Sequence, residues 1–387
     1  MIYLDHAATA PLDERVFEAM LPFLRPGGIH GNPSSDHAAG REAKAAVERA
    51  RGQVAALIGA EPAEIVFTSG ATEADNLAIK GALEFYRDRG RHIITSRVEH
   101  KAVLDTCRYL ETQGVRVTYL MPNRDGQVTP EQVLAALTPE TQLVSLMWVN
   151  NETGVINDIE RLAPMLRERS ILFHVDAVQA VGRMPVDMRA TPVDLLALSG
   201  HKLYGPKGIG ALFVRKKPRA RVAPQLHGSG HEQGMRSGTL PTHQIAGMGE
   251  AFRLAGVDFA HEPGRLRELR DRLWAGLSQL PDVYLNGEGA PRAPGILNVS
   301  FGGVEGESLR ASLPELCVSS GSACSSATRE PSFVLRSMGR DDRLAGASLR
   351  FSLGHKNSVA EIDRAAELVR IQVLRLRALS PLTGNAA

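Results

Sequence analysis

The sequence contains few cysteines and no long apolar run. Its 387 residues include only Cys107, Cys317 and Cys324. An odd number of widely spaced cysteines argues against a disulfide framework and against a Cys-x-x-Cys metal site, and it is typical of a reducing compartment. No stretch approaches the roughly 18 apolar residues of a membrane-spanning helix, and the first residues lack a signal-peptide pattern. We therefore expect a cytoplasmic protein without a membrane partner.

An excess of charge of one sign is also missing. Lys and Arg total 45 against 43 Asp and Glu, which gives a formal net charge of +2. This balance does not indicate direct binding to nucleic acid. Hydrophobic residues make up 43% of the chain, a fraction that argues against disorder and allows a packed core. At about 150 residues per domain, the length is compatible with a large α/β domain and a smaller second one.

Short apolar runs alternate with helical segments between about residues 34 and 216. Helices are expected over 34–60, 71–90 and 100–114. The expected strands lie within 64–70, 92–96, 115–120, 141–151, 171–179, 194–202 and 208–216. Nearly continuous apolar strands separated by helices predict a mostly parallel, seven-stranded sheet that is covered on both faces.

The arrangement of helical and apolar segments changes after about residue 241. Helical segments over 241–257 and 262–280 lead into shorter apolar runs and a final helix near 358–379. This pattern is typical of a smaller α+β unit. We expect a large domain over residues 15–258, and a small domain formed by residues 1–14 together with 259–387.

Ligands of such sheets bind outside the carboxyl ends of the strands, so the residues at those ends are informative. Ala71 and Thr72 follow a strand and open a helix, where backbone N–H groups and a hydroxyl suit a phosphate; an ordinary strand–helix turn is the alternative. Asp176 ends another strand, where a protonated ring nitrogen is one natural partner for its carboxylate. A helix N-cap is the alternative for Asp176.

The most specific string is SGHKLYGPKGIG, in which Lys202 follows a strand among small residues. A desolvated lysine with a lowered pKa can form a Schiff base, whereas a surface lysine is the alternative. His100 follows a further strand and could stack on a planar cofactor, or be purely structural. Arg350 could clamp a carboxylate, or be a solvated strand residue. A phosphate site, an acid for a ring nitrogen and a Schiff-base lysine are what a pyridoxal phosphate (PLP) site needs.

Cys324 lies in SSGSACSSATREPSF, a run of Ser, Gly and Ala. Such a run is poorly suited to core packing and well suited to an accessible thiol, although an incidental cysteine in a loop is the alternative.

Several stretches together resemble the cysteine desulfurases of the IscS/NifS type, which are fold-type I PLP enzymes. The resemblance covers about residues 2 to 380 and rests on YLDHAAT, GNPSS, EIVFTSGATEADNLAIKG, RVEHKAVLDTC, VNNETG, HVDAVQAVG, SGHKLYGPKGIGAL, GMRSGT and VSSGSAC. It implies removal of sulfur from L-cysteine, which gives L-alanine and a persulfide on Cys324. The sulfur would pass to acceptors such as an iron–sulfur scaffold protein, and to tRNA thiolation.

The resemblance also implies a role for each matching residue. Lys202 would hold PLP covalently, and His100 would stack on the ring and move protons. The remaining implied ligands are Asp176 for the ring nitrogen, Gln179 for the phenolic oxygen, Ala71, Thr72, Ser199 and His201 for the phosphate, Thr239 for the phosphate of a partner subunit in a homodimer, Asn151 beside the cofactor, and Asn151 with Arg350 for the substrate carboxylate. No resident metal is implied, although transient iron–sulfur ligation by Cys324 stays open.

The sequence departs from the family pattern at a few positions. Ala10, Trp148, Ser229 and Gln233 stand where threonine, histidine, glycine and arginine are usual. The chain also stops sooner than the housekeeping members, whose tail helps to dock the scaffold, so scaffold docking through a tail is in doubt. A selenocysteine lyase, another PLP-dependent lyase or aminotransferase, and a non-catalytic sulfur carrier remain as alternatives.

Overall fold

The computed structural model describes residues 1–320 and 330–379. The described helices are α1 (Glu14–Met20), α2 (Ala38–Leu57), α3 (Ala71–Phe85), α4 (Lys101–Thr112), α5 (Pro130–Ala136), α6 (Ile159–Glu168), α7 (Thr242–Asp258), α8 (Glu262–Leu277), α9 (Gly306–Ala311), α10 (Phe333–Ser337), α11 (Asp342–Gly346) and α12 (Val359–Leu379). The described strands are β1 (Ile2–Tyr3), β2 (Ile65–Thr68), β3 (His92–Ser96), β4 (Arg116–Leu120), β5 (Thr141–Met147), β6 (Leu172–Asp176), β7 (Leu195–Ser199), β8 (Gly210–Val214), β9 (Val283–Leu285), β10 (Ile296–Phe301), β11 (Leu316–Cys317) and β12 (Ser348–Ser352).

The largest sheet has seven strands in the order β2-β8-β7-β6-β5-β3-β4, which confirms the expected fold class. Only β8 runs antiparallel to its neighbours, β2 and β7. The short turn between β7 and β8 explains this exception, because a parallel pair needs a crossover of a dozen or more residues. The carboxyl ends of β2, β3, β5, β6 and β7 therefore meet at one edge of the sheet.

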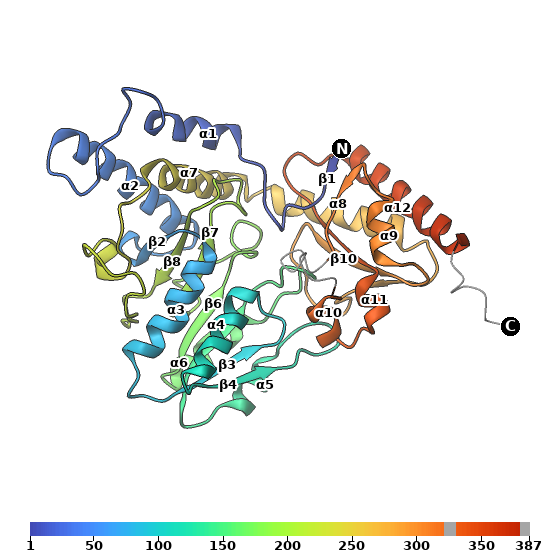
Figure 1. Cartoon of the computed structure of the whole chain (residues 1–387), viewed down its shortest axis with the longest axis horizontal. Coiled ribbons are helices and arrows are strands. Elements are labelled where there is room, and N and C mark those ends of the chain that lie inside the picture. The colour runs from blue at the N-terminus through green and yellow to red at the C-terminus, as the bar shows by residue number, and fades with distance from the viewer. Residues whose placement is uncertain (321–329, 380–387) are drawn as a thin grey trace.

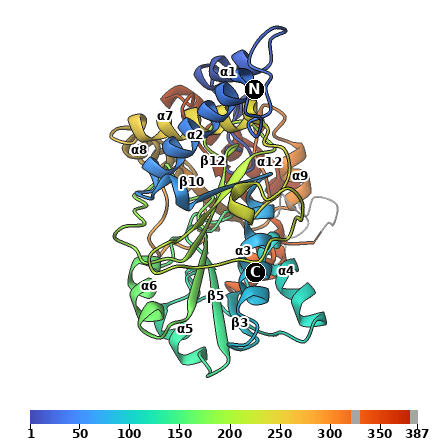
Figure 2. The same ribbon diagram turned by 90° about the vertical axis from the view of Figure 1, so that its left-hand side faces the viewer.

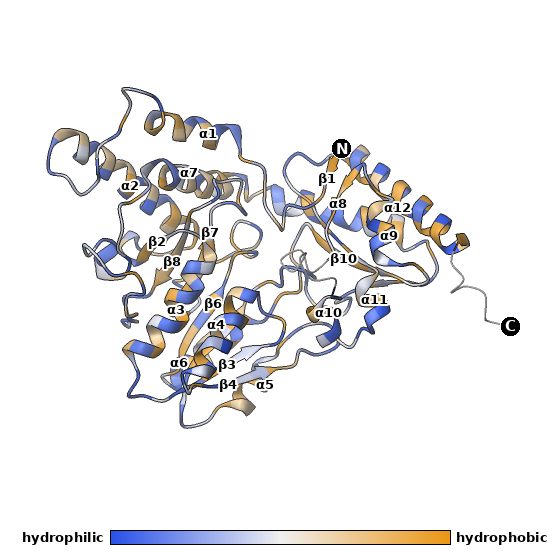
Figure 3. Ribbon diagram, viewed as in Figure 1, coloured by the Kyte–Doolittle hydropathy of each residue, from blue (hydrophilic) through white to orange (hydrophobic). Residues whose placement is uncertain are grey.

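Both faces of this sheet are covered, because alternate residues of each strand pack in opposite directions. Phe173 and Val175 of β6 pack in a core shared with α2, α6 and α7. The opposite face packs against α3 and α4, with Leu195 of β7 beside α3 and Ile93 of β3 beside α4. Figure 3 shows the matching pattern on α3, where hydrophobic and hydrophilic bands alternate along the helix.

A second group of elements surrounds the antiparallel sheet β12-β10-β9. Its core joins residues of α8, α9 and α12 with those of β10 and β12. In Figure 1 these elements lie to the right of the seven-stranded sheet, and Figure 2 shows the molecule turned by 90°. The N-terminal segment joins this group, since β1 pairs with β11 in parallel and Leu4 is fully buried in the same core.

Local signals explain where several helices begin. The Thr129 side chain accepts a hydrogen bond from the Gln132 N–H, and the Gln132 Oε1 accepts one from the Thr129 N–H, so a capping box opens α5. The helix expected over 34–60 begins at Ala38, and the His37 side chain caps it by accepting a hydrogen bond from the Gly40 N–H. In the part of the chain described, no helix combines the length and the apolar character that crossing a membrane requires.

Candidate active site

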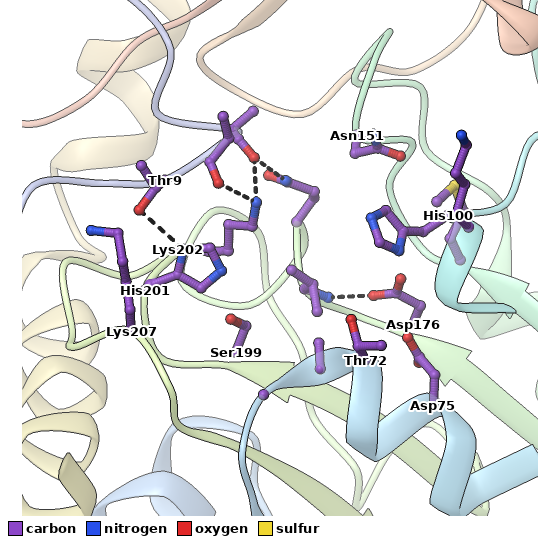
Figure 4. A pocket seen from close by; sticks show the side chains of 18 of the residues that line it. Thr9, Thr72, Asp75, His100, Asn151, Asp176, Ser199, His201, Lys202 and Lys207 are labelled. Atoms are coloured by element: carbon purple, nitrogen blue, oxygen red, sulfur yellow. Dashed lines mark hydrogen bonds between the residues drawn. The ribbon is translucent and has the colours of Figure 1, made fainter. Parts of the chain in front are cut away.

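A cavity of about 600 Å³ opens at the edge where the carboxyl ends of the parallel strands meet. Its volume falls within the range of small-molecule sites. Side chains from the start of α3, the ends of β6 and β7, the turn after β5 and the N-terminal segment line it (Figure 4). Of the residues predicted from the sequence, those brought to this cavity are Ala71, Thr72, His100, Asn151, Asp176, Gln179, Ser199, His201, Lys202 and Arg350.

One end of the cavity is suited to an anion. Ala71 is the first residue of α3, whose N-terminal N–H groups carry partial positive charge. The Ser199 Oγ is buried and has no hydrogen-bond partner among the described residues. Gly210 makes this arrangement possible, because a Cβ there would lie 2.6 Å from the carbonyl carbon of Gly70 and from the Leu198 oxygen.

His201 lies at the same end of the cavity. Its Nδ1 is 3.0 Å from the Thr9 Oγ1, which fixes the orientation of the ring. Burial, followed by the charges of Lys202 and Lys207, lowers the pKa of His201 to about 4. The ring is therefore neutral at pH 7, and two lysines stand beside it to attract a negatively charged group.

Asp176 supplies a buried carboxylate at the end of β6. Burial raises its pKa, whereas the charges of His100 and Lys202 and a hydrogen bond from the Val178 N–H act in the opposite direction. That N–H donates to the Asp176 Oδ1 over 3.0 Å. A buried carboxylate of this kind favours a cationic or proton-donating partner, which a protonated ring nitrogen would provide.

Lys202 reaches across the cavity to the N-terminal segment. Its Nζ donates hydrogen bonds to the carbonyl oxygens of Ala7 at 2.6 Å and of Ala8 at 2.7 Å. The Gln179 Nε2 donates to the same Ala7 oxygen over 2.9 Å. Figure 4 shows the Lys202 amine pointing into the cavity toward these carbonyl groups. The segment before α1 is thus part of the site and closes one of its walls.

His100, Asn151 and Arg350 also line the cavity. The His100 Nδ1 accepts a hydrogen bond from the Ala102 N–H and caps α4, and Figure 4 shows its ring in the cavity. Arg350 is only 2% exposed. It donates to the Asn151 carbonyl oxygen over 2.9 Å and to the Asp5 Oδ1 over 2.8 Å. A carboxylate thus already occupies one face of the Arg350 guanidinium group.

One predicted site residue of the described part of the chain is not brought to this cavity. Thr239 is exposed and does not line it. Cys324 lies outside the described residues. Of the other two cysteines, Cys107 is buried in α4 as expected, and Cys317 is half-buried at the end of β11.

Sequence reasoning missed several residues of the site. Asp5 contacts Arg350 across 345 residues and Thr9 contacts His201 across 192, separations that no short stretch of sequence spans. Asp75 was detectable, because it stands on the apolar stripe of α3 with Ala78 and Ala82, where a charge is unusual. Glu99, directly before His100, is also fully buried. In residues 1–320 and 330–379 no group of three or more His, Cys, Asp or Glu side chains is arranged to hold a metal ion.

Comparison of the chain with known protein families identifies the class of protein to which this fold and cavity belong. The family described as aminotransferase class-V matches residues 2–365 of the chain. The cysteine desulfurase IscS of Pectobacterium carotovorum is 59% identical over 382 residues, which cover 98% of this chain and 95% of that protein. The IscS of Escherichia coli is 58% identical with the same coverage. The chain therefore belongs to the class-V aminotransferase family and, within it, to the cysteine desulfurases of the IscS type.

Solved structures agree with this assignment. A NifS-like protein superposes with a TM-score of 0.89 at 35% identity, and the match covers 97% of this chain and all of that chain. DndA from Streptomyces lividans gives a TM-score of 0.77 at 40% identity, with 90% and 99% covered. SspA in complex with cysteine gives 0.81 at 36% identity, with 91% and 99% covered.

Proposed function

We propose that this protein is a PLP-dependent cysteine desulfurase that releases the sulfur of L-cysteine as a persulfide on Cys324 and leaves L-alanine. The observation that carries the proposal is the cavity in which Lys202, Asp176 and the start of α3 converge. It is supported by the identity of 58–59% to the IscS proteins and by the similarity to a structure solved in complex with cysteine.

The residues present fit PLP. Its phosphate suits the N–H groups of Ala71 and Thr72 and the unpaired Ser199 hydroxyl, with His201 beside them. Asp176 suits the ring nitrogen, and Gln179 lies on the same wall as Asp176 to meet the phenolic oxygen. When bound, PLP supplies the electron sink that allows the C–S bond of the substrate to break.

The chain provides the binding and proton-holding groups around this chemistry. Lys202 would hold the cofactor through its amine, and Asp176 would keep a proton on the ring nitrogen. His100 would stack on the ring and move a proton near the reacting atoms. The Cys324 thiolate, the nucleophilic form of cysteine, would form an S–S bond with the substrate sulfur as the C–S bond breaks, and uptake of a proton by the carbon fragment would complete L-alanine.

Arg350 is our candidate for binding the substrate carboxylate, together with Asn151. It lines the cavity, is almost fully buried, and its Nε has no hydrogen-bond partner among the described residues. A substrate carboxylate would meet the guanidinium group where Asp5 now contacts it. Binding would therefore exchange one carboxylate for another and leave the buried Arg350 paired.

Supplying the purified protein with L-cysteine and a reductant tests the activity. We expect sulfide and alanine in equal amounts. Formation of an oxo acid in place of alanine would indicate an aminotransferase, and absence of both products would indicate a non-catalytic carrier. A parallel assay with L-selenocysteine shows whether a selenocysteine lyase describes the protein better.

The cofactor attachment is tested by borohydride reduction of the protein incubated with PLP, followed by digestion. We expect the phosphopyridoxyl label on the peptide that carries Lys202, and loss of the label in Lys202→Ala. Lys207 also lines the cavity, so Lys207→Ala is the matched control and should keep the label. A label on any other lysine would refute the assignment.

The sulfur-accepting residue is tested by mass spectrometry after one addition of L-cysteine without reductant. We expect one additional sulfur on the Cys324 peptide, and almost no sulfur release from Cys324→Ser, which should still bind PLP. Cys107→Ser is the matched control and should turn over like the parent protein. Sulfur on Cys107 or Cys317, or full turnover by Cys324→Ser, would overturn the mechanism.

We further propose that the protein is cytoplasmic, with residues 15–258 as the large domain and residues 1–14 and 259–387 as the small one. We also propose a homodimer in which Thr239 of each subunit reaches the phosphate site of the other. Thr239 is exposed and is not among the residues that line the cavity of its own subunit, which supports the dimer. Mixing Lys202→Ala with Thr239→Ala subunits should restore one PLP site per dimer. A fully active monomer in sedimentation would contradict this. An iron–sulfur scaffold protein is the acceptor that we expect.

A further inference from the structure

Polar side chains form a row across the large sheet beneath α3. Ser145 of β5 and His174 of β6 are register partners, and both are fully buried. Because Phe173 and Val175 pack on the opposite face of the sheet, His174 and Asp176 face α3. Asp75 of α3, which is 1% exposed, meets this row from the helix side and lines the cavity. Figure 4 shows its carboxyl group pointing toward Asp176.

Direct contacts connect the row. The His174 Nδ1 lies 2.9 Å from the Ser145 Oγ, and the His174 Nε2 lies 3.4 Å from the Asp75 Oδ1. That second contact is longer than a typical hydrogen bond. Within the described residues, neither carboxyl oxygen of Asp75 nor the His174 Nε2 has a closer hydrogen-bonding partner. Since unpaired buried polar groups are costly, the two side chains are each other's available partner.

The charges around Asp75 favour its neutral form. Burial raises the pKa of Asp75, and the nearby carboxyl groups of Asp176 and Glu99 raise it further. Burial also raises the pKa of Glu99, with Asp176 adding to the effect. Burial lowers the pKa of His174 to about 3, so this ring is neutral and offers Asp75 no positive charge. Carboxyl groups that share a site of low dielectric cannot all ionise.

Asp176 is the carboxyl group of this cluster with the partners that stabilise an anion. Burial raises its pKa, but the charges of His100 and Lys202 and the hydrogen bond from the Val178 N–H oppose this rise. Of Asp75 and Asp176, which both line the cavity, Asp176 therefore carries the negative charge.

We propose that Asp75 and His174 are positioning residues for Asp176. The Asp75 carboxyl O–H donates to the His174 Nε2, and the His174 Nδ1–H donates to the Ser145 Oγ. As a neutral pair they confine the negative charge to Asp176, which then holds the proton of the cofactor ring nitrogen. This inference rests on the proposed binding of PLP.

The first test measures the protonation state of His174 itself and needs no cofactor. In the apoprotein labelled with ¹⁵N-histidine, assigned with His174→Gln, the His174 ring should be the neutral Nδ1–H tautomer at pH 7. It should remain neutral on acidification to pH 5. A positively charged His174, which would mean an ion pair with an ionised Asp75, or the opposite tautomer, would overturn the proposal whether or not PLP binds.

The second test compares Asp75→Asn with Asp75→Leu after reconstitution with ¹⁵N-labelled PLP. Asparagine is neutral and can donate to the His174 Nε2, so PLP affinity should stay within about threefold of the parent and the ring nitrogen should remain protonated. Leucine leaves the buried His174 Nε2 unpaired, and we expect an affinity lower by about tenfold or more with partial loss of ring-nitrogen protonation. The matched control is Asp194→Asn, a buried aspartate before β7 that accepts the Phe173 N–H, which should leave both readouts unchanged.

Two outcomes of the second test would refute the proposal. A loss of ring-nitrogen protonation in Asp75→Asn would show that Asp75 carries the charge. A parent-like affinity and protonation in Asp75→Leu would show that the pair positions nothing. Failure of the parent protein to bind PLP would instead refute the proposed function, and the state of His174 would still be measured in the apoprotein.

Discussion

A buried ion pair between Arg51 and Glu232 offers the sharpest test of how the loop before Thr239 is held. The guanidinium group donates to both carboxylate oxygens, at 2.8 and 2.7 Å. The Phe67 N–H donates to the same carboxylate over 2.6 Å. The two side chains are 8% and 1% exposed. Glu232 and Gln233 both have positive φ, of 49° and 57°, so the pair also holds a strained turn in place.

Removing one partner should be strongly destabilising. Glu232→Gln leaves the Arg51 charge buried with only the exposed Glu48 nearby, and we expect the free energy of unfolding to fall by about 3–5 kcal/mol. Arg51→Met should have a similar effect. The double variant removes both charges, and its loss should be smaller than the sum of the single losses by at least about 2 kcal/mol.

The assay is urea denaturation of the four proteins of this cycle, followed by circular dichroism at one fixed protein concentration without added PLP. The control cycle uses Arg272 and Asp363, which also form two short contacts, at 2.5 and 2.8 Å, but are about half exposed. Solvent screens such a pair, so its coupling should be close to the measurement error. A coupling for Arg51 and Glu232 no larger than that of the control would refute the reasoning.

Three further predictions concern other parts of the chain. Burial raises the pKa of the Cys107 thiol to about 12, so iodoacetamide at pH 8 should leave Cys107 unmodified until the protein is unfolded; its labelling in the folded protein would contradict the buried placement. Burial lowers the pKa of His6 to about 4, so its neutral form stabilises the fold above pH 6.5 and this contribution is lost as the pH falls to 4. The free energy of unfolding should therefore fall less in His6→Phe than in the parent over this interval, by up to about 3 kcal/mol. Urea titrations at pH 7, 5.5 and 4.5 measure this difference, and an equal dependence of the unfolding free energy on pH in the two proteins would exclude the effect. Gly210→Ala should destabilise the protein by about 1–3 kcal/mol, since its Cβ meets backbone atoms at 2.6 Å, whereas Gly52→Ala, with open space around it, should not.

The sequence predicts the large sheet well because its strands are short, nearly continuous apolar runs. Each of the seven expected runs contains a strand, and residues that follow the carboxyl ends of β2, β3, β5, β6 and β7 line one cavity. A continuous apolar run indicates a strand that is buried on both faces, so these strands can be predicted without knowledge of distant contacts. The shorter helices and strands are harder to predict from the sequence. The capping box at Thr129 marks the start of α5, whereas the two-residue strands β1 and β11 are too short to show a periodic pattern.

The site was predicted only as far as local signals reach. Lys202 and Asp176 stand at strand ends and are visible in the sequence. The Asp5 contact of Arg350 depends on a pairing across 345 residues, which no window of the sequence contains. Asp75 shows a third case, because its charge on the apolar stripe of α3 is visible, whereas its partner His174 follows only from the packing of α3 on β6.

The N-terminal wall of the cavity has a consequence for the order in which the protein matures. Residues 2–9 leave the ribosome long before the residues that they contact, which include Cys317, Arg350 and Ser352. Native contacts of such long range form late, because the loop between them must close first. The nascent chain can therefore build most of the large sheet before the Lys202 amine meets the carbonyl groups of Ala7 and Ala8 in their final place. Assembly of the site therefore waits for β12, so a product that is stalled or truncated before Arg350 and Ser352 lacks a finished cavity.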